Sequence, residues 1–159
     1  AEMVTGIPTT IDRDAAQRSY GDAWNRWFGR AHDPTGLASE RNELRYRHLD
    51  EVVVRVGRDT PEGAVAAARL AAEISGTPLR VSDASVESDA ELIDRLNASR
   101  VERLRLLTDA SEELRAACYA SGIEIDTEPV SVSGRRELRR WLREQAISRT
   151  THRHGRVAP

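Results

Sequence analysis

Lysine is absent from this 159-residue chain, cysteine occurs once, and aromatic residues make up only 4% of it. The single thiol, Cys118, excludes an internal disulfide framework and a thiolate-rich metal site. No segment approaches the run of about 20 apolar residues that crosses a bilayer, so we expect no transmembrane segment. The first ten residues also lack the charged-then-apolar pattern of a secretory signal.

Charge is abundant and unevenly distributed. All 24 basic side chains are arginine, and 26 acidic residues leave a formal net charge of −2. Residues 135–156 contain eight arginines against two glutamates, whereas the rest of the chain contains sixteen arginines against twenty-four acidic residues. The basic C-terminal segment is therefore expected to bind an anionic partner or an acidic surface of its own protein.

The N-terminal segment predicts a linker followed by an aromatic helix. Residues 1–11 have no helical periodicity, whereas a helix is expected over 12–29 with Trp24, Trp27 and Phe28 on one face. Such a face next to a linker favours docking on a neighbouring domain. We therefore predict that residues 1–43 form a linker and docking helix.

The middle of the chain alternates between strand and helix signals. Helix starts are expected where Thr60, Ser88 and Ser111 act as N-caps. The expected strands are 52–56, 79–81, 104–107 and 123–126. This alternation predicts βαβ units and a Rossmann-like parallel sheet with helices on both faces, in the α/β class.

The remaining boundaries follow from this pattern. We predict a Rossmann-like domain over residues 44–134 and a C-terminal segment over 135–159. The spacing of Leu138, Trp141 and Leu142 predicts a last helix over 135–146, with arginines on its other face. An extended C-terminal motif is expected to follow that helix.

A dinucleotide site is disfavoured by the first strand–helix turn, Gly57–Gly63. It lacks the G-x-G-x-x-G pattern, Pro61 removes a backbone donor, and acidic residues there would repel a pyrophosphate. Carboxylates nevertheless recur where the expected strands end, at Asp59, Asp83, Asp109 and Asp126. N-capping of helices is the structural explanation for the first three of them.

Other candidate chemical groups are weak. Cys118 shares a helical face with Leu114 and Ala117, which predicts a buried, inert thiol rather than a nucleophile. His152 and His154 could supply two metal ligands, but zinc needs three or four, so we predict no metal site. No nucleic-acid binding is expected, because the whole chain is acidic and no aromatic residues alternate with the arginines.

Two stretches resemble a known family. The first is the C-terminal Leu142-Arg143-Glu144-Gln145-Ala146-Ile147-Ser148, followed by Thr151-His152-Arg153 and Gly155. The second is the segment 28–37 together with 43–47. Both are similar to the longer members of proline utilization A, bacterial flavoenzymes that join proline dehydrogenase to L-glutamate γ-semialdehyde dehydrogenase.

The resemblance implies that the chain is the extra C-terminal domain of such an enzyme, a relative of the aldehyde dehydrogenase nucleotide domain that has lost catalysis. It implies no catalytic, cofactor-binding or metal-binding residues in this segment, while the parent chain uses NAD and FAD in the cytoplasm, with a peripheral membrane association through its proline dehydrogenase domain. The partners would be the catalytic dehydrogenase domains of the same chain. The terminal motif would cover the aldehyde dehydrogenase active site and the cavity through which the intermediate passes. The expected interaction residues are Trp24, Trp27, Phe28, Arg143, Glu144, Gln145, Ser148, Thr151, His152, Arg153 and Gly155.

Two alternatives remain open at this point. One is a free-standing Rossmann-like nucleotide-binding enzyme that uses the carboxylates at the strand ends. The other is an arginine-rich nucleic-acid-binding module, which steep salt dependence of DNA binding would reveal.

Overall fold

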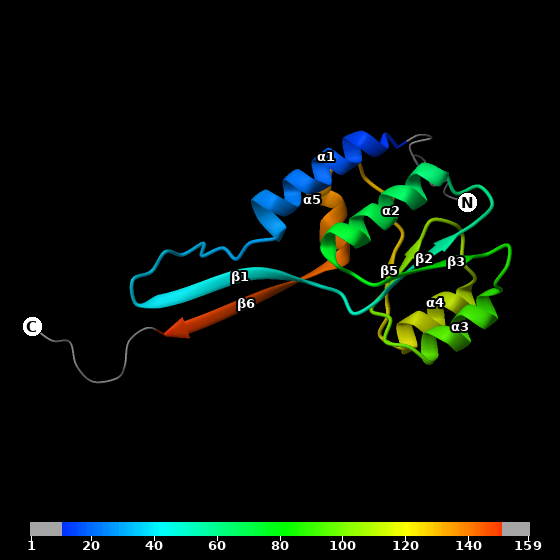
Figure 1. Cartoon of the computed structure of the whole chain (residues 1–159). Helices are drawn as coiled ribbons and strands as arrows, with labels where there is room; N and C mark the ends of the chain where they lie inside the picture. The colour runs from blue at the N-terminus through cyan, green and yellow to red at the C-terminus, as the bar shows by residue number, and fades with distance from the viewer. Residues whose placement is uncertain (1–10, 151–159) are drawn as a thin grey trace, which may run out of the picture.

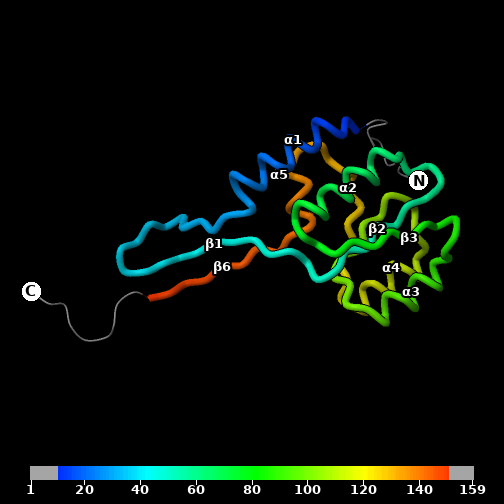
Figure 2. Tube along the Cα trace, in the orientation of Figure 1, coloured from blue at the N-terminus to red at the C-terminus, as the bar shows by residue number. Residues whose placement is uncertain are grey.

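The computed structural model describes residues 11–150 (Figure 1; Figure 2). Its helical elements are α1 (Arg13–Ala23), the π-helical turn η1 (Trp24–Phe28), α2 (Glu62–Ser75), α3 (Asp89–Asn97), α4 (Glu112–Ala120), α5 (Gly134–Glu137) and the 3-10 turn η2 (Leu138–Trp141). Its strands are β1 (Glu40–His48), β2 (Val52–Val56), β3 (Leu79–Asp83), β4 (Arg103–Leu106), β5 (Glu124–Asp126) and β6 (Leu142–Thr150).

Four of these strands form a parallel sheet in the order β3-β2-β4-β5. Helices α1, α2 and α5 lie over one face, and α3 and α4 lie over the other (Figure 1). The apolar core is divided accordingly: Val52, Val54 and Val56 pack towards α2, whereas Val53 packs towards α3 and α4. The predicted α/β class, the parallel sheet and its two helical layers are confirmed.

The ends of the helices largely follow their capping residues. Ser88 forms a capping box with Glu91, and the Ser111 hydroxyl accepts a hydrogen bond from the Leu114 amide, as predicted. The prediction for Thr60 is wrong, because Pro61 is the N-cap of α2. The Thr60 hydroxyl instead accepts from the Gly57 amide (2.8 Å) and donates to the Leu107 carbonyl (3.1 Å), which joins the loops after β2 and β4.

The predicted last helix over 135–146 is also wrong beyond Trp141. The chain turns at Leu142, which is extended (φ −127°, ψ 152°), and β6 follows as far as Thr150. After Leu142 no large apolar side chain continues the helical stripe, so packing does not favour another turn. Pairing with β1 satisfies the backbone instead, which makes the C-terminal motif extended.

Helices α1 and α5 approach each other closely at Gly134. A Cβ atom built on this glycine would lie 2.3 Å from the carbonyl oxygen of Ser19, and the Ser19 hydroxyl accepts a hydrogen bond from the Gly134 amide. The N-terminal helix is therefore fixed against the segment that leads into β6. The domain boundaries predicted after residues 43 and 134 stay predictions.

Candidate functional site

Strands β1 and β6 form an antiparallel ribbon that extends away from the layered domain (Figure 1). Pairing runs from His48 opposite Leu142 at the root to Glu40 opposite Thr150 at the outer end. At a rise of about 3.4 Å per residue, nine paired positions give a ribbon about 30 Å long. Side chains become more exposed along β6 towards its outer end.

One edge of this ribbon, the outer edge of β6, is unpaired within the described residues. Leu44 exchanges both of its backbone hydrogen bonds with His32, on the side of β1 that faces away from β6. Leu44 and Ala146 are therefore a non-hydrogen-bonded pair, so the N–H and C=O groups of Ala146 face outward on β6. The same holds for alternate residues from Leu142 to Thr150. Within residues 11–150, no other strand pairs with this edge.

The root of the ribbon is anchored by buried polar groups. Glu137 forms an ion pair with Arg105, and both side chains are completely buried. The Glu137 carboxylate also accepts hydrogen bonds from Trp141 Nε1 (3.0 Å) and from the Ser131 amide (2.9 Å). The Trp141 carbonyl accepts from Thr77 Oγ1 (2.7 Å) and the Leu49 amide (3.1 Å). Trp141 is thus held from several sides immediately before β6 begins.

Two predicted motif residues make contacts that stabilise the ribbon itself. The Arg143 guanidinium lies 2.9 Å from Asp50 Oδ1 and 3.0 Å from Glu102 Oε2, which connects β6 to the layered domain. Gln145 Oε1 accepts a hydrogen bond from Arg45 Nε at 2.8 Å. Arg143 and Gln145 are two residues apart along β6, so their side chains lie on the same face of the ribbon.

Glu144 and Ser148 lie on the opposite face and are exposed. Their backbone groups also belong to the unpaired edge. Neither Glu144 nor Ser148 makes a side-chain hydrogen bond or ion pair within residues 11–150 that would keep it from contacting another domain. Thr151, His152, Arg153 and Gly155 lie outside the described residues, as does His154.

The predicted docking aromatics pack within the chain. Phe28 is 2% exposed and lies edge-on to Tyr46 of β1, with 4.9 Å between ring centroids. Trp27 donates from Nε1 to the Tyr46 hydroxyl (3.1 Å) and stacks on His32 at 4.3 Å. Trp24 is half-buried against the same core. This aromatic cluster braces the ribbon against α1, and docking of its exposed parts on another domain stays a prediction.

A separate cavity of about 280 Å³ lies at the carboxyl ends of the parallel strands, lined by the loops after β2, β4 and β5. It contains Asp59 and Asp109, but not Asp83 or Asp126. The explanation of Asp59, Asp83 and Asp109 as N-caps is wrong, because Pro61, Ser88 and Ser111 hold those positions. Asp83 accepts hydrogen bonds from Ser85, and Asp126 pairs with Arg140 at 2.7 Å.

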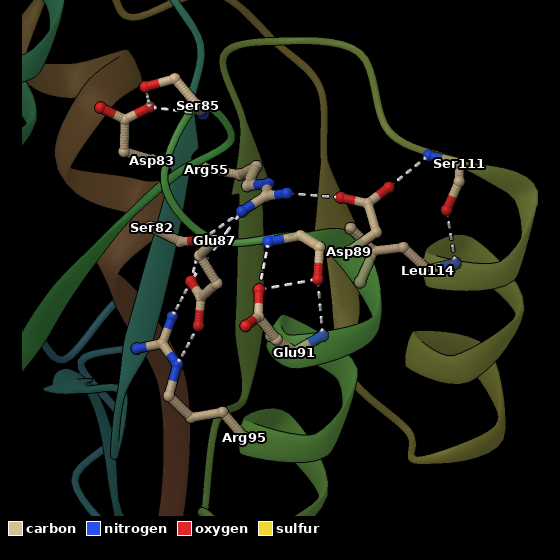
Figure 3. A network of polar contacts seen from close by, with 11 residues as sticks. Arg55, Ser82, Asp83, Ser85, Glu87, Asp89, Glu91, Arg95, Ser111 and Leu114 are labelled. Atoms are coloured by element: carbon tan, nitrogen blue, oxygen red, sulfur yellow. Dashed lines mark hydrogen bonds and ion pairs between the residues drawn. The ribbon is translucent and has the colours of Figure 1, made fainter.

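A buried arginine, Arg55, lies near the carboxyl ends of the neighbouring strands β2 and β3 (Figure 3). Arg55 of β2 is 1% exposed and contacts Ser82 Oγ and Asp89 Oδ1, each at 2.6 Å. The other oxygen of Asp89 accepts from the Ser111 amide, which connects the starts of α3 and α4. Burial acts to raise the pKa of Asp89, but hydrogen bonds from Ser111 and Arg55 outweigh it and hold that pKa below its usual value.

Sequence reasoning did not identify Arg55 and Arg105 as central groups. A signal was present, since each is a single charge inside an otherwise apolar strand, Val-Val-Val-Arg-Val and Leu-Arg-Leu-Leu. A guanidinium at such a position is buried and needs a carboxylate partner. The sequence does not show which carboxylate supplies it.

No family model and no curated protein matched this chain. Among solved structures, proline utilization A (PutA) from Corynebacterium freiburgense superposes with a TM-score of 0.71 at 28% sequence identity. The match covers 96% of this chain and 16% of PutA. The chain resembles a segment of PutA. Histidinol dehydrogenase from Elizabethkingia anophelis gives a TM-score of 0.49 at 8% identity, over 74% of this chain and 34% of that one.

Because the chain spans only 16% of the length of PutA, the similarity concerns a small part of a larger protein. The protein that contains the similar segment is named for proline utilization. The similarity also indicates that other domains accompany such a segment. The similarity to PutA extends over nearly the whole chain, well beyond the short stretches at 28–37 and 142–148.

The thiol of Cys118 is free and buried. Cys118 is on the buried face of α4, as predicted, and burial raises the pKa of its thiol, which disfavours the reactive thiolate. Within residues 11–150, no group of three or more His, Cys, Asp or Glu side chains is placed to hold a metal ion. No helix in this range is long and apolar enough to span a membrane.

Proposed function

We propose that this chain is a non-catalytic cover domain of a bifunctional enzyme that converts proline to glutamate. In that enzyme it would cover the active site of the NAD-dependent L-glutamate γ-semialdehyde dehydrogenase and the cavity that carries the intermediate. Its partners would be the catalytic domains of the same chain, which would bind NAD and FAD. The proposed location of the enzyme is the cytoplasm.

The observation that carries this proposal is the protruding ribbon with its unpaired β6 edge. The edge offers a row of outward N–H and C=O groups on the strand that contains the PutA-like motif. A long, open strand edge is costly for a protein to leave exposed, since it can pair with other chains. Pairing with a strand of a catalytic domain would satisfy these groups and would hold the C-terminal segment at that domain's surface.

A cover of this kind has a physical benefit. It excludes water from the aldehyde-oxidising site and prevents loss of a reactive intermediate to solvent. The buried ion pair and the aromatic cluster at the ribbon's root would hold the cover at a fixed angle. No residue of the chain needs to take part in the chemistry.

Ser148 provides a matched test in the full-length enzyme that carries this chain. Its amide faces outward and its side chain is exposed, so Ser148→Pro removes one edge donor, whereas Ser148→Ala keeps it. We expect Ser148→Pro to lower coupled proline-to-glutamate turnover about tenfold, which corresponds to about 1.4 kcal/mol. Ser148→Ala should retain normal turnover, and both variants should oxidise proline normally.

Deletion of residues 146–159 should produce the same pattern with a larger loss. Unchanged coupled turnover in both Ser148→Pro and the truncation would contradict the proposal. Calorimetric binding of NAD, ATP or S-adenosylmethionine by the 159-residue chain would instead favour a free-standing nucleotide-dependent enzyme. DNA binding with a steep salt dependence would favour the nucleic-acid module.

A further inference from the structure

The cavity at the carboxyl ends of the sheet lies where open α/β sheets bind ligands. After β3 the chain crosses β2 to form β4 on the other side, so the order of the strands reverses between β2 and β4. The helices that follow these two strands, α2 and α4, lie on opposite faces of the sheet, and such a reversal leaves a crevice beside the strand ends. Asp59 and Thr60 follow β2, and Thr108 and Asp109 follow β4, and all four line the cavity.

Arg115 of α4 contributes a positive charge to the lining of this cavity. The residue as a whole is half-buried, and its guanidinium makes no ion pair or hydrogen bond with any residue in 11–150. Every other buried or half-buried arginine in that range has a carboxylate within ion-pair distance: Arg45, Arg55, Arg80, Arg95, Arg103, Arg105 and Arg140. An anionic ligand in the cavity would give the Arg115 guanidinium the counter-charge that those other arginines already have.

The two carboxylates that line the cavity also have no side-chain partner among the described residues. Asp59 and Asp109 form no side-chain hydrogen bond with another described residue, and neither lies within 4.0 Å of the Arg115 guanidinium. The cavity therefore contains positive and negative groups that do not neutralise one another. The lining also has an apolar part, which includes Leu107 and Val130.

We propose that this cavity binds a small zwitterionic amino acid with an apolar side chain. The ligand's carboxylate would pair with Arg115, whose planar guanidinium suits a bidentate contact. Its ammonium group would lie between Asp59 and Asp109, and its side chain would contact the apolar wall.

Size and backbone chemistry oppose a dinucleotide. A volume of about 280 Å³ lies at the lower limit for small-molecule sites. Pro61 at the N-cap of α2 supplies no backbone donor, and Glu62 follows it in the first turn. An anionic pyrophosphate has no favourable cradle there.

The experiment is an NMR titration of the whole 159-residue chain with L-valine and two analogues of the same shape. Isovalerate lacks the ammonium group, and isobutylamine lacks the carboxylate. We expect saturable amide shifts around the cavity with L-valine, and binding at least about tenfold weaker with either analogue. Absence of saturable shifts with L-valine, or equal binding of isovalerate, would overturn the proposal.

Variants assign the two charged ends. Arg115→Gln and Asp109→Asn should each weaken L-valine binding about tenfold, and Asp109→Asn should leave isovalerate binding unchanged. Arg69→Gln, an exposed arginine on α2 outside the cavity, is the matched control and should bind normally. Amide spectra of the free variants verify folding. Unaltered affinity in folded Arg115→Gln would refute the assigned role of the guanidinium, whatever the outcome of the Ser148 experiment.

Discussion

Glu137 should be among the most sensitive positions in the chain. Its carboxylate is completely buried, pairs with the equally buried Arg105, and accepts from Trp141 and Ser131. Glu137→Gln preserves the size and an acceptor oxygen but removes the charge. Removal of one partner of a buried ion pair typically costs about 3 to 5 kcal/mol.

We expect Glu137→Gln to lower the free energy of unfolding by about 3 kcal/mol, measured as the urea midpoint at constant m-value. For a domain of this size, that corresponds to a fall in melting temperature of about 6 to 12 °C. Glu128→Gln is the control, because that carboxylate is 70% exposed and lies 3.7 Å from Arg140. The control should change stability by less than about 0.5 kcal/mol.

The double variant Arg105→Met/Glu137→Gln distinguishes the cost of removing one charge of the pair from the cost of removing both charges. It removes the buried guanidinium together with the Glu137 charge. Asp126, which also lies 3.3 Å from Arg105, keeps Arg140 at 2.7 Å, so the double variant should be more stable than Glu137→Gln alone. Hydrogen exchange should accelerate along β6 in the single variant, because Glu137 holds Trp141 at the start of that strand. A cost below about 1 kcal/mol for Glu137→Gln, or additive effects of the two substitutions, would refute this reasoning.

Two further predictions concern the packing of α1. Gly134→Ala should lower stability by about 1 to 3 kcal/mol in thermal unfolding, because the added methyl group meets the backbone of Ser19, whereas Gly21→Ala faces open space and should not destabilise. Equal stability of both variants would contradict the close approach. Burial, aided by the Glu137 carboxylate, raises the pKa of Tyr20 above its usual 10.0, so the stability that its neutral phenol provides is complete below pH 10 and is lost as pH rises further. Tyr20→Phe should show a shallower decline of the urea midpoint above pH 10, and an unchanged decline would exclude this cause.

Local signals in the sequence were sufficient for the layered domain. The β-branched run at 52–56 forms β2, Ser88 and Ser111 cap their helices, and Gly76 ends α2 with a left-handed φ of 73°. Each of these signals acts within a few residues, so no knowledge of the tertiary structure is needed. That is why the α/β class and its parallel sheet could be predicted.

The ribbon could not be predicted, because its determinants lie far apart in the sequence. Leu138, Trp141 and Leu142 fit a helix as well as they fit a turn followed by a strand. The strand is selected by pairing with β1, about a hundred residues earlier, as in the Arg45–Gln145 contact. The Arg105–Glu137 ion pair depends on tertiary placement in the same way.

The ribbon's stability and its proposed role depend on different parts of it. A two-stranded ribbon alone is marginal in water, so this one depends on its root, where Trp141, Tyr46 and Arg143 connect it to the domain. The N–H and C=O groups of Ser148, in the ribbon's outer half, are directed away from β1. A partner strand could therefore pair with the edge near Ser148 without displacing any backbone hydrogen bond within residues 11–150. The free energy of such pairing would go into the complex rather than into breaking backbone pairs of the described residues.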